Sequence, residues 1–132
     1  MPNADSFAEA TKKTTEIGRA VVNHLNAGEK SDEPLWAAYW DAGFESVEGD
    51  GQSWKGIDEV RKKHAEWYAA FTVHNCKAEG PYVTNDAFAV KIEMEIEAND
   101  GSMPRISMSE IGLYTVADGK VVREQFFNAP RD

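Results

Sequence analysis

The stretch from Met103 to Pro130 constrains the fold more than any other part of this 132-residue chain. It is typical of two long strands, Met103–Val116 and Lys120–Asn128, joined at the turn sequence Ala117-Asp118-Gly119. Apolar residues recur along both strands, as they must where one face of a hairpin is buried. The sequence therefore predicts an antiparallel hairpin whose apolar face other elements must cover.

Glu110 does not fit this apolar pattern easily, because an ionised carboxylate is costly to bury unless it is paired or hydrogen-bonded. Strand alternation places it on the same face as Met108 and Tyr114. Burial would raise its pKa and leave it protonated near neutral pH, ready to act as an acid or a hydrogen-bond donor. The alternative is a structural glutamate bonded to a backbone amide or to an arginine such as Arg61 or Arg123.

The side of the sheet on which Glu124 lies depends on the register of the hairpin. A two-residue turn at Asp118-Gly119 would put Arg123 on the face of Glu110. A longer or bulged turn would put Glu124 there instead. In the second case the protonation of the two glutamates would be coupled, and they would form an acid/base pair. The alternative is a Glu124 that is solvated or paired with a lysine.

Three amphipathic helices are predicted before the long strands. The first begins at Asp5 or Ser6 and ends at Asn26-Ala27-Gly28, and the second begins at Ser31-Asp32-Glu33-Pro34. The third runs from Ile57 to Phe71 and places His64 on its inward face. Inward His64 is either a hydrogen-bonded core histidine or a pocket residue. The second helix carries a dense set of aromatic residues that suits core packing or a pocket wall: Trp36, Tyr39 and Trp40.

The remaining segments complete an α+β pattern. Phe44–Glu48 alternates like a short strand, and Thr72–Thr84 is interrupted at Gly80-Pro81, which indicates a bulge or an edge position. Ala87–Ala98 alternates strictly between apolar and charged residues, so one side of this strand faces water. Long, twisted antiparallel strands would curl around the helices and leave a cavity at one end.

Composition excludes several classes of partner. The formal charge of −9 argues against nucleic acid or an anionic membrane. Cys76 is the single cysteine, so no intramolecular disulfide forms, which fits the cytoplasm. The first residues lack the basic and apolar regions of a signal peptide, and no apolar stretch has membrane-spanning length.

No motif points to a metal or a cofactor. His74 and Cys76 share a strand face, but a metal site needs three or four converging ligands and nothing at suitable spacing joins them. The loop Gly49–Ser53 lacks the spacing of a phosphate-binding motif, and no dinucleotide fingerprint is present. The sequence therefore predicts a protein without metal or cofactor.

Three short motifs, in this order and spacing, give the chain a resemblance to a known superfamily. They are Leu25-Asn26-Ala27-Gly28, Trp54-Lys55-Gly56 and Val116–Val122. Across nearly its whole length the chain resembles the nuclear transport factor 2-like superfamily, and within it the SnoaL-like group. The resemblance implies one domain, 1–132, with a cone-shaped, curved antiparallel sheet wrapped around three N-terminal helices and a pocket at the wide end. It also implies a homodimer through the sheet, and a patch on the outer face (Ile111 and Leu113) would serve that contact.

The superfamily includes isomerases, polyketide cyclases, dehydratases, epoxide hydrolases and non-catalytic binders, so the fold alone does not decide the function. Ketosteroid isomerases use an aspartate base, a tyrosine donor and a protonated aspartate. By motif alignment the tyrosine position falls at Val21, the base position at or beside Gly49, and the buried acid near Glu110. This departure argues against steroid-type isomerisation. The resemblance favours a pocket-facing orientation for Glu124, Phe126 and Asn128.

We therefore expect a cofactor-free enzyme that acts by proton transfer on a small, largely apolar molecule, through isomerisation, cyclisation or dehydration. Glu110 would be the acid or base, with Glu124, His64 and Tyr114 as helpers. The alternatives are a non-catalytic small-molecule binder and a protein-interaction module of the same fold. The residues expected to line the pocket are Trp36, Trp40, Trp54, Trp67, Phe71, Met108, Phe126 and Asn128.

Overall fold

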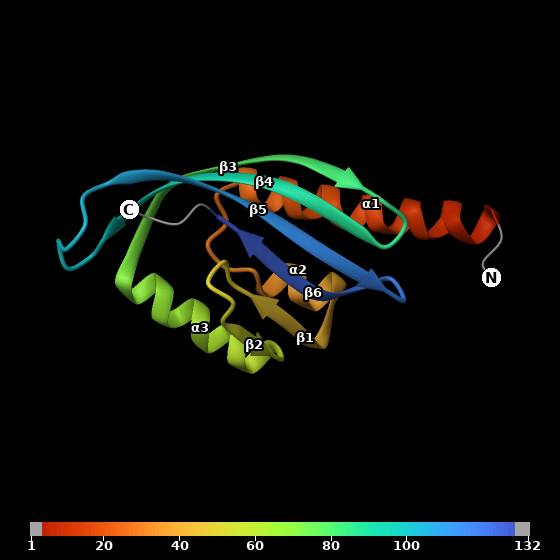
Figure 1. The fold of residues 1–132 in the computed structure, drawn as a ribbon, viewed down its shortest axis with the longest axis horizontal. Coiled ribbons are helices and arrows are strands. Elements are labelled where there is room, and N and C mark those ends of the chain that lie inside the picture. Colours follow the sequence, from red (N-terminus) through yellow and green to blue (C-terminus); the bar gives the residue numbers. More distant parts are fainter. Residues whose placement is uncertain (1–3, 129–132) are drawn as a thin grey trace.

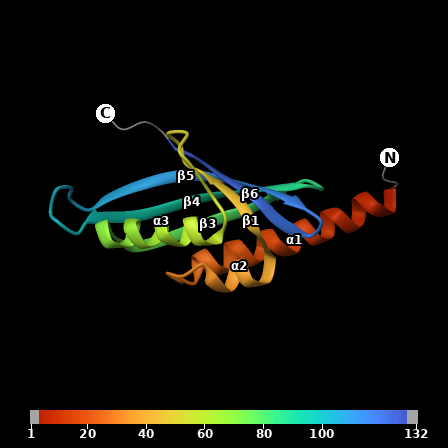
Figure 2. The same ribbon diagram turned by 90° about the horizontal axis from the view of Figure 1, so that it is seen from below.

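The computed structural model describes residues 4–128, in which three helices lie on one face of a six-stranded sheet (Figures 1 and 2). Pro130, the last residue of the predicted hairpin stretch, lies outside this range. The helices are α1 (Ala4–Asn26), α2 (Glu33–Tyr39) and α3 (Ile57–Ala70). The strands are β1 (Trp40–Val47), β2 (Ser53–Lys55), β3 (Phe71–Val83), β4 (Ala87–Ala98), β5 (Ile106–Ala117) and β6 (Lys120–Phe127).

The sheet has the order β2-β1-β6-β5-β4-β3 and is antiparallel except between β1 and β6. The predicted α+β arrangement of three helices and a meander of long strands is confirmed. Two local predictions differ. Trp40 begins β1 instead of ending the second helix, and a short strand that the sequence did not predict, β2, begins at the last residue of the predicted loop Gly49–Ser53.

Helix α1 is fixed to β3 and to the turn after it by specific contacts. The Asn26 side chain donates to the carbonyl of Ala78 (3.1 Å) and accepts from its amide (2.8 Å), so it acts as a strand partner for β3. The buried hydroxyl of Thr14 donates to the carbonyl of Asn85 (3.0 Å). Through its two hydrogen bonds, the asparagine of Leu25-Asn26-Ala27-Gly28 sets the position of the C-terminal end of α1.

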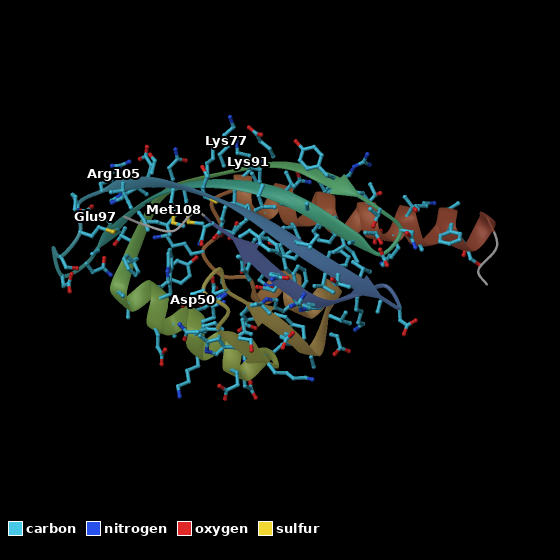
Figure 3. The ribbon with its side chains drawn as sticks, viewed as in Figure 1. Asp50, Lys77, Lys91, Glu97, Arg105 and Met108 are labelled. Carbon is cyan, nitrogen blue, oxygen red and sulfur yellow. The ribbon has the colours of Figure 1, made fainter. Side chains whose placement is uncertain are left out.

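Strands β3 and β4 form a long hairpin with one solvent-exposed face. Figure 3 shows Lys77 and Lys91 on the side of the sheet away from α3. Residues of β4 with the opposite parity are buried, as the alternation predicted, and include Phe88, Val90 and Ile92. The register of β3 shifts between Glu79 and Tyr82, so the interruption predicted around Gly80-Pro81 is both a bulge and part of an edge strand.

The β5–β6 hairpin combines a tight turn with a bulge. Asp118 and Gly119 both have positive φ angles (51° and 75°), and Ala117 pairs with Lys120, as in a two-residue turn. The register then shifts by one residue at Val122, because Val116 pairs with Val121 whereas Thr115 pairs with Arg123. As a result Glu124 lies opposite Tyr114, on the same face as Glu110. Of the two registers that the sequence left open, the bulged one is present.

Candidate functional site

A cavity of about 730 Å³ lies between α3 and the inner face of the sheet. Its walls come from α3, from β3 to β6, and from the segment that follows α1. The apolar part of the wall includes Trp67, Phe71, Ile92, Met94 and Met108. Ligand pockets for small molecules have volumes of roughly 300–1,000 Å³ and are mostly apolar with a few polar groups, and this cavity has both properties.

Glu110 projects from β5 into this cavity. No hydrogen bond from residues 4–128 reaches its carboxyl group. Among the described residues, every side-chain polar atom that is fully buried has a hydrogen-bonding partner, so the unbonded carboxyl group of Glu110 is not fully buried. The carboxyl group is therefore open to the cavity. Burial, and to a smaller extent the charge of Glu48, raise the pKa of Glu110 to about 7, while Lys63 opposes this shift. Such a group is close to half protonated at neutral pH and can donate or accept a proton.

The two arginines that would have made Glu110 a structural ion-pair partner are engaged elsewhere. Arg61 pairs with Glu33 and with Asp58 on the surface. The Arg123 guanidinium pairs with Glu45 at 3.1 Å and donates to the side chain of Gln125 at 3.0 Å. Glu110 thus has no arginine partner among the described residues.

Tyr114 lies on the same face of β5 as Glu110, with Gly112 between them. A Cβ atom on Gly112 would lie only 3.0 Å from the Tyr114 hydroxyl oxygen and 2.9 Å from Cε2, so the ring folds back over the glycine. The ring stacks on Phe88 at 4.7 Å between centroids. Burial holds the pKa of the phenol well above its usual range, so Tyr114 remains a hydrogen-bond donor at the cavity wall.

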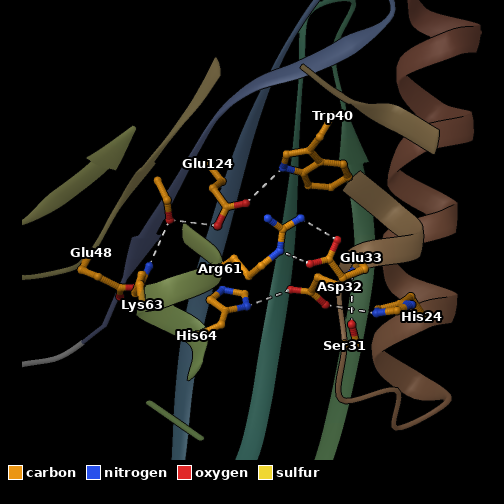
Figure 4. Close-up of polar contacts among 11 residues, drawn as sticks. His24, Ser31, Asp32, Glu33, Trp40, Glu48, Arg61, Lys63, His64 and Glu124 are labelled. Atoms are coloured by element: carbon orange, nitrogen blue, oxygen red, sulfur yellow. Dashed lines mark hydrogen bonds and ion pairs between the residues drawn. The ribbon is translucent and has the colours of Figure 1, made fainter. Parts of the chain in front are cut away.

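Glu124 is more deeply buried than Glu110 and is satisfied by neighbours. It is 5% exposed and is not one of the residues that line the cavity. The indole N–H of Trp40 donates to Oε1 (3.2 Å) and the hydroxyl of Ser46 donates to Oε2 (3.0 Å; Figure 4). Burial raises the pKa of Glu124 to about 7, against the opposing effects of Lys63 and of these hydrogen bonds.

Lys63 connects this buried group to the cavity. Its ammonium donates to the hydroxyl of Ser46 (3.0 Å) and forms an ion pair with Glu48. It also lies 4.6 Å from the centroid of the Trp54 ring, within the range of a cation–π contact. Lys63 and Glu48 both line the cavity. Because its charge is matched by Glu48, Lys63 does not present a free cation to an acidic ligand.

A second set of polar groups lies on the helix side of the cavity. His64 of α3 faces Asp32, with Nδ1 of the ring 3.9 Å from Oδ2 of the carboxylate. Burial lowers the pKa of His64, although the charge of Asp32 opposes the shift. The ring is therefore uncharged at neutral pH and packs against Trp36 at 5.3 Å between centroids. An uncharged imidazole has one nitrogen free to accept a proton.

A sequence profile described as the SnoaL-like domain matches residues 11–128. The chain belongs to the SnoaL-like domain family. No curated protein sequence matches it significantly. The described helices include none that is long and apolar enough to cross a membrane.

Solved structures give the same fold for this SnoaL-like domain, which is of the nuclear transport factor 2-like type. A protein from Mesorhizobium loti with the provisional name SnoaL-like polyketide cyclase is 29% identical, with a TM-score of 0.76, over 85% of this chain and 96% of that one. A similarly named protein from Jannaschia sp. CCS1 is 20% identical, with a TM-score of 0.72, over 89% and 86% of the two chains. A protein provisionally named an isomerase from Bacillus subtilis is 14% identical, with a TM-score of 0.67, over 92% and 89%.

Not all predicted pocket residues line the cavity of this SnoaL-like domain. Trp67, Phe71, Met108, Phe126 and Asn128 do. The structure instead places the other three tryptophans away from the lining. Trp36 and Trp40 are each 4% exposed and pack in the core, and Trp54 packs beside the core beneath Lys63.

Two positions singled out by the family alignment carry no acid or phenol here. Val21 is buried in the core of the SnoaL-like domain. A Cβ atom on Gly49 would lie 2.3 Å from Oδ1 of Asn128, so the Asn128 amide occupies the space of a side chain at that position. Neither position can therefore supply the phenol or the carboxylate base of a ketosteroid isomerase here.

Sequence reasoning missed several polar residues of the cavity. Asp32 was interpreted as part of a helix start, and Lys63 and Glu48 carried no signal beyond their places on a helix and a short strand. Cys76 also lines the cavity, but burial raises the pKa of its thiol, which disfavours the nucleophilic thiolate. Residues 4–128 contain no group of three or more potential ligands that would hold a metal ion.

Proposed function

We propose that this chain is a cofactor-free enzyme of the SnoaL-like type, acting by proton transfer on a small, largely apolar molecule. The observation that carries the proposal is the Glu110 carboxyl group, which opens into the cavity, has no hydrogen-bonding partner among residues 4–128 and has a pKa of about 7. A carboxyl group in a cleft whose pKa is strongly shifted is typical of an acid/base site. Tyr114 and His64 line the same cavity and would assist it.

Isomerisation, cyclisation and dehydration share the chemistry that this site offers. Each removes a proton from one atom of the substrate and adds a proton to another. Glu110 would supply one of these protons, and the Tyr114 hydroxyl would donate a hydrogen bond to a developing oxyanion. The apolar walls and the matched charge of Lys63 favour an uncharged substrate. The provisional names of the solved relatives, polyketide cyclase and isomerase, belong to this range of reactions. We propose a smaller part for Glu124, which would act through Ser46 and Lys63 instead of touching the substrate.

The test is hydrogen exchange and turnover of small ketones and β-hydroxy ketones in D₂O, followed by NMR. Wild type should incorporate deuterium or convert a compound, and Glu110→Gln should lose at least about 10²-fold in rate. Glu93→Gln is a matched control, because Glu93 is an exposed residue of the adjacent strand β4. Equal rates for wild type and Glu110→Gln would contradict the proposal. If wild type and Glu110→Gln bind a compound equally tightly and neither changes it, the chain is a non-catalytic binder.

We also propose a homodimer, formed through the outer face of the sheet. Ile111 and Phe127 are cross-strand neighbours on β5 and β6 and are 41% and 46% exposed. Adjacent apolar side chains exposed on a sheet are a typical place for a symmetric contact. We further propose a cytoplasmic location, since the single cysteine allows no internal disulfide.

A further inference from the structure

Three side chains, from α1, from the loop before α2 and from α3, meet beside the cavity (Figure 4). Nε2 of His24, near the end of α1, lies 3.1 Å from Oδ1 of Asp32. The other carboxylate oxygen, Oδ2, lies 3.9 Å from Nδ1 of His64 in α3. Asp32 thus lies between two imidazole rings, of which His64 lines the cavity and His24 is almost completely buried.

The Asp32 carboxylate is available for this arrangement because it does not cap the helix that it precedes. Asp32 is the N-cap residue of α2, yet its side chain makes no capping hydrogen bond. The hydroxyl of Ser31 accepts from the amide of Glu33 instead (3.3 Å). An aspartate at this position normally satisfies an amide of the first helical turn. Here its carboxylate points to the histidines, which is a second observation that favours a role in the cavity.

His24 fixes the carboxylate from the other side. The hydrogen bond with Asp32 raises the pKa of His24, although its burial acts in the opposite direction. Asn26 holds the end of α1 against β3, so the position of His24 is set by the fold. With Oδ1 held by His24, the free oxygen Oδ2 is the one that faces His64.

We propose that Asp32 is a positioning residue that keeps the proton of neutral His64 on Nδ1, so that Nε2 carries the lone pair of a general base in the cavity. This inference rests on the proposed acid/base function and names its second partner. The distance of 3.9 Å is longer than a hydrogen bond, and such contacts in unliganded proteins commonly shorten when a substrate binds. Which imidazole nitrogen is protonated depends on the hydrogen bond that the other nitrogen makes.

With Glu110 as the acid, the proton transfers balance for a carbonyl substrate. Nε2 of His64 accepts a proton from carbon, and the C–H electron pair forms the C=C bond of an enol as Glu110 protonates the carbonyl oxygen. For an isomerisation, the imidazolium then returns its proton to a different carbon. The enol hydroxyl gives its proton back to Glu110, so both residues regain their starting forms. The charge of Asp32 stabilises the imidazolium between these steps.

The tautomer of His64 can be measured without any substrate. Imidazole ¹⁵N shifts of the full-length wild-type protein, assigned with His64→Gln, should show a protonated Nδ1 and an unprotonated Nε2 above the pKa of His64. In Asp32→Asn this preference should be lost. A wild-type His64 with its proton on Nε2 would overturn the inference, as would an identical tautomer in Asp32→Asn. The wild-type spectrum decides the first point even if the variant does not fold.

Kinetics supply the second readout. Asp32→Asn should reduce kcat by at least about 10²-fold with little change in KM. Charged groups of four segments act on His64: Asp32, Glu33, Glu48 and Lys63. The charge of Asp32 raises the pKa of His64. In Asp32→Asn, the limb of the pH–rate profile that reports the deprotonation of His64 should therefore move to lower pH. Glu33→Gln is the matched control, since Glu33 pairs with Arg61. Equal effects of both variants would indicate a general loss of negative charge and would overturn the positioning role.

The two proposals fail in different ways. An inactive wild-type protein with the Nδ1-protonated tautomer would refute the enzymatic function and leave the Asp32–His64 geometry intact. An active protein whose His64 carries its proton on Nε2 would refute the role of Asp32 alone.

Discussion

Glu110 and Glu124 lie on the same face of one hairpin, and burial raises the pKa of each to about 7, yet their surroundings differ. Glu124 accepts hydrogen bonds from Trp40 and Ser46, so its burial is compensated by bonds. Glu110 has no such donor among residues 4–128 and faces the cavity. An unpaired, partly buried carboxyl group costs stability when it ionises, and this cost is consistent with a residue retained for binding or catalysis.

Glu110→Gln should stabilise the protein at alkaline pH and leave its stability unchanged in acid. The pKa of Glu110 in the fold, about 7, is above the ordinary 4.5, so the unfolded chain loses this proton first as the pH rises. The free energy of unfolding therefore falls between these two values and levels off above them. At about pH 8 the variant should be more stable by about 1–3 kcal/mol.

Urea denaturation of both proteins at about pH 4 and pH 8 measures this difference. Other groups titrate in the same range, so the comparison with Glu93→Gln shows what Glu110 alone contributes. A variant that is less stable than wild type at pH 8 would show that the Glu110 carboxylate is stabilised by a partner.

Among the helices and strands, the long strands were predictable because apolar and polar residues alternate along them. β4 and β5 lie within a few residues of their predicted bounds, because period-2 alternation with a wet face has few other solutions. The sequence could not decide the register of the last hairpin, because the bulge at Val122 follows a turn that is itself two residues long. The short strand β2 carried no signal, since three residues beside a glycine-rich loop have no measurable period.

The polar residues of the site were harder to predict, for a related reason. Asp32 in a helix-start sequence is explained by capping alone, and only the packing of α1 and α3 around it reveals that its carboxylate is used elsewhere. Trp40 was expected in a helix at the pocket, but its indole N–H pairs with Glu124 in the core, a contact between residues 84 positions apart. Contacts of this kind depend on the register and are invisible to local patterns.

Asn26→Ala tests how α1 is held against the edge strand β3. The substitution removes two hydrogen bonds to the backbone of Ala78, one donated and one accepted. Loss of this pair should lower the free energy of unfolding by about 1–3 kcal/mol. Asn23→Ala, at an exposed position of the same helix, should have a much smaller effect. Equal destabilisation by the two variants would mean that the contact with β3 contributes nothing beyond helix propensity.

For the whole molecule, the SnoaL-like family and its fold follow from the sequence profile and the solved structures. They do not supply the substrate, because solved structures with this fold carry different provisional names, polyketide cyclase and isomerase. The arrangement of helices on one face of the sheet leaves the other face to water or to a second copy (Figure 2). The resemblance predicted a contact there, and the exposed pair of Ile111 and Phe127 adds a residue that the sequence pattern had not indicated.

Ile111→Lys should convert a dimer into monomers. Wild type should sediment at twice the mass of one 14.7 kDa chain, whereas a lysine at position 111 would bury a charge in the apolar contact and prevent association. Phe7→Lys is the control, because Phe7 is also exposed and apolar but belongs to α1. A monomeric wild type, or a dimer that survives Ile111→Lys, would contradict the proposed interface.

The acid/base chemistry proposed for this cavity depends on the protonation of Glu110 near neutral pH. This protonation can be measured directly by following the ¹³C shifts of the glutamate carboxyl groups with pH, with Glu110→Gln used to assign the resonance. We predict a midpoint of about 7 for Glu110. A midpoint close to the ordinary 4.5 would show that the carboxylate is solvated or paired, and would remove the basis for acid/base chemistry in this cavity.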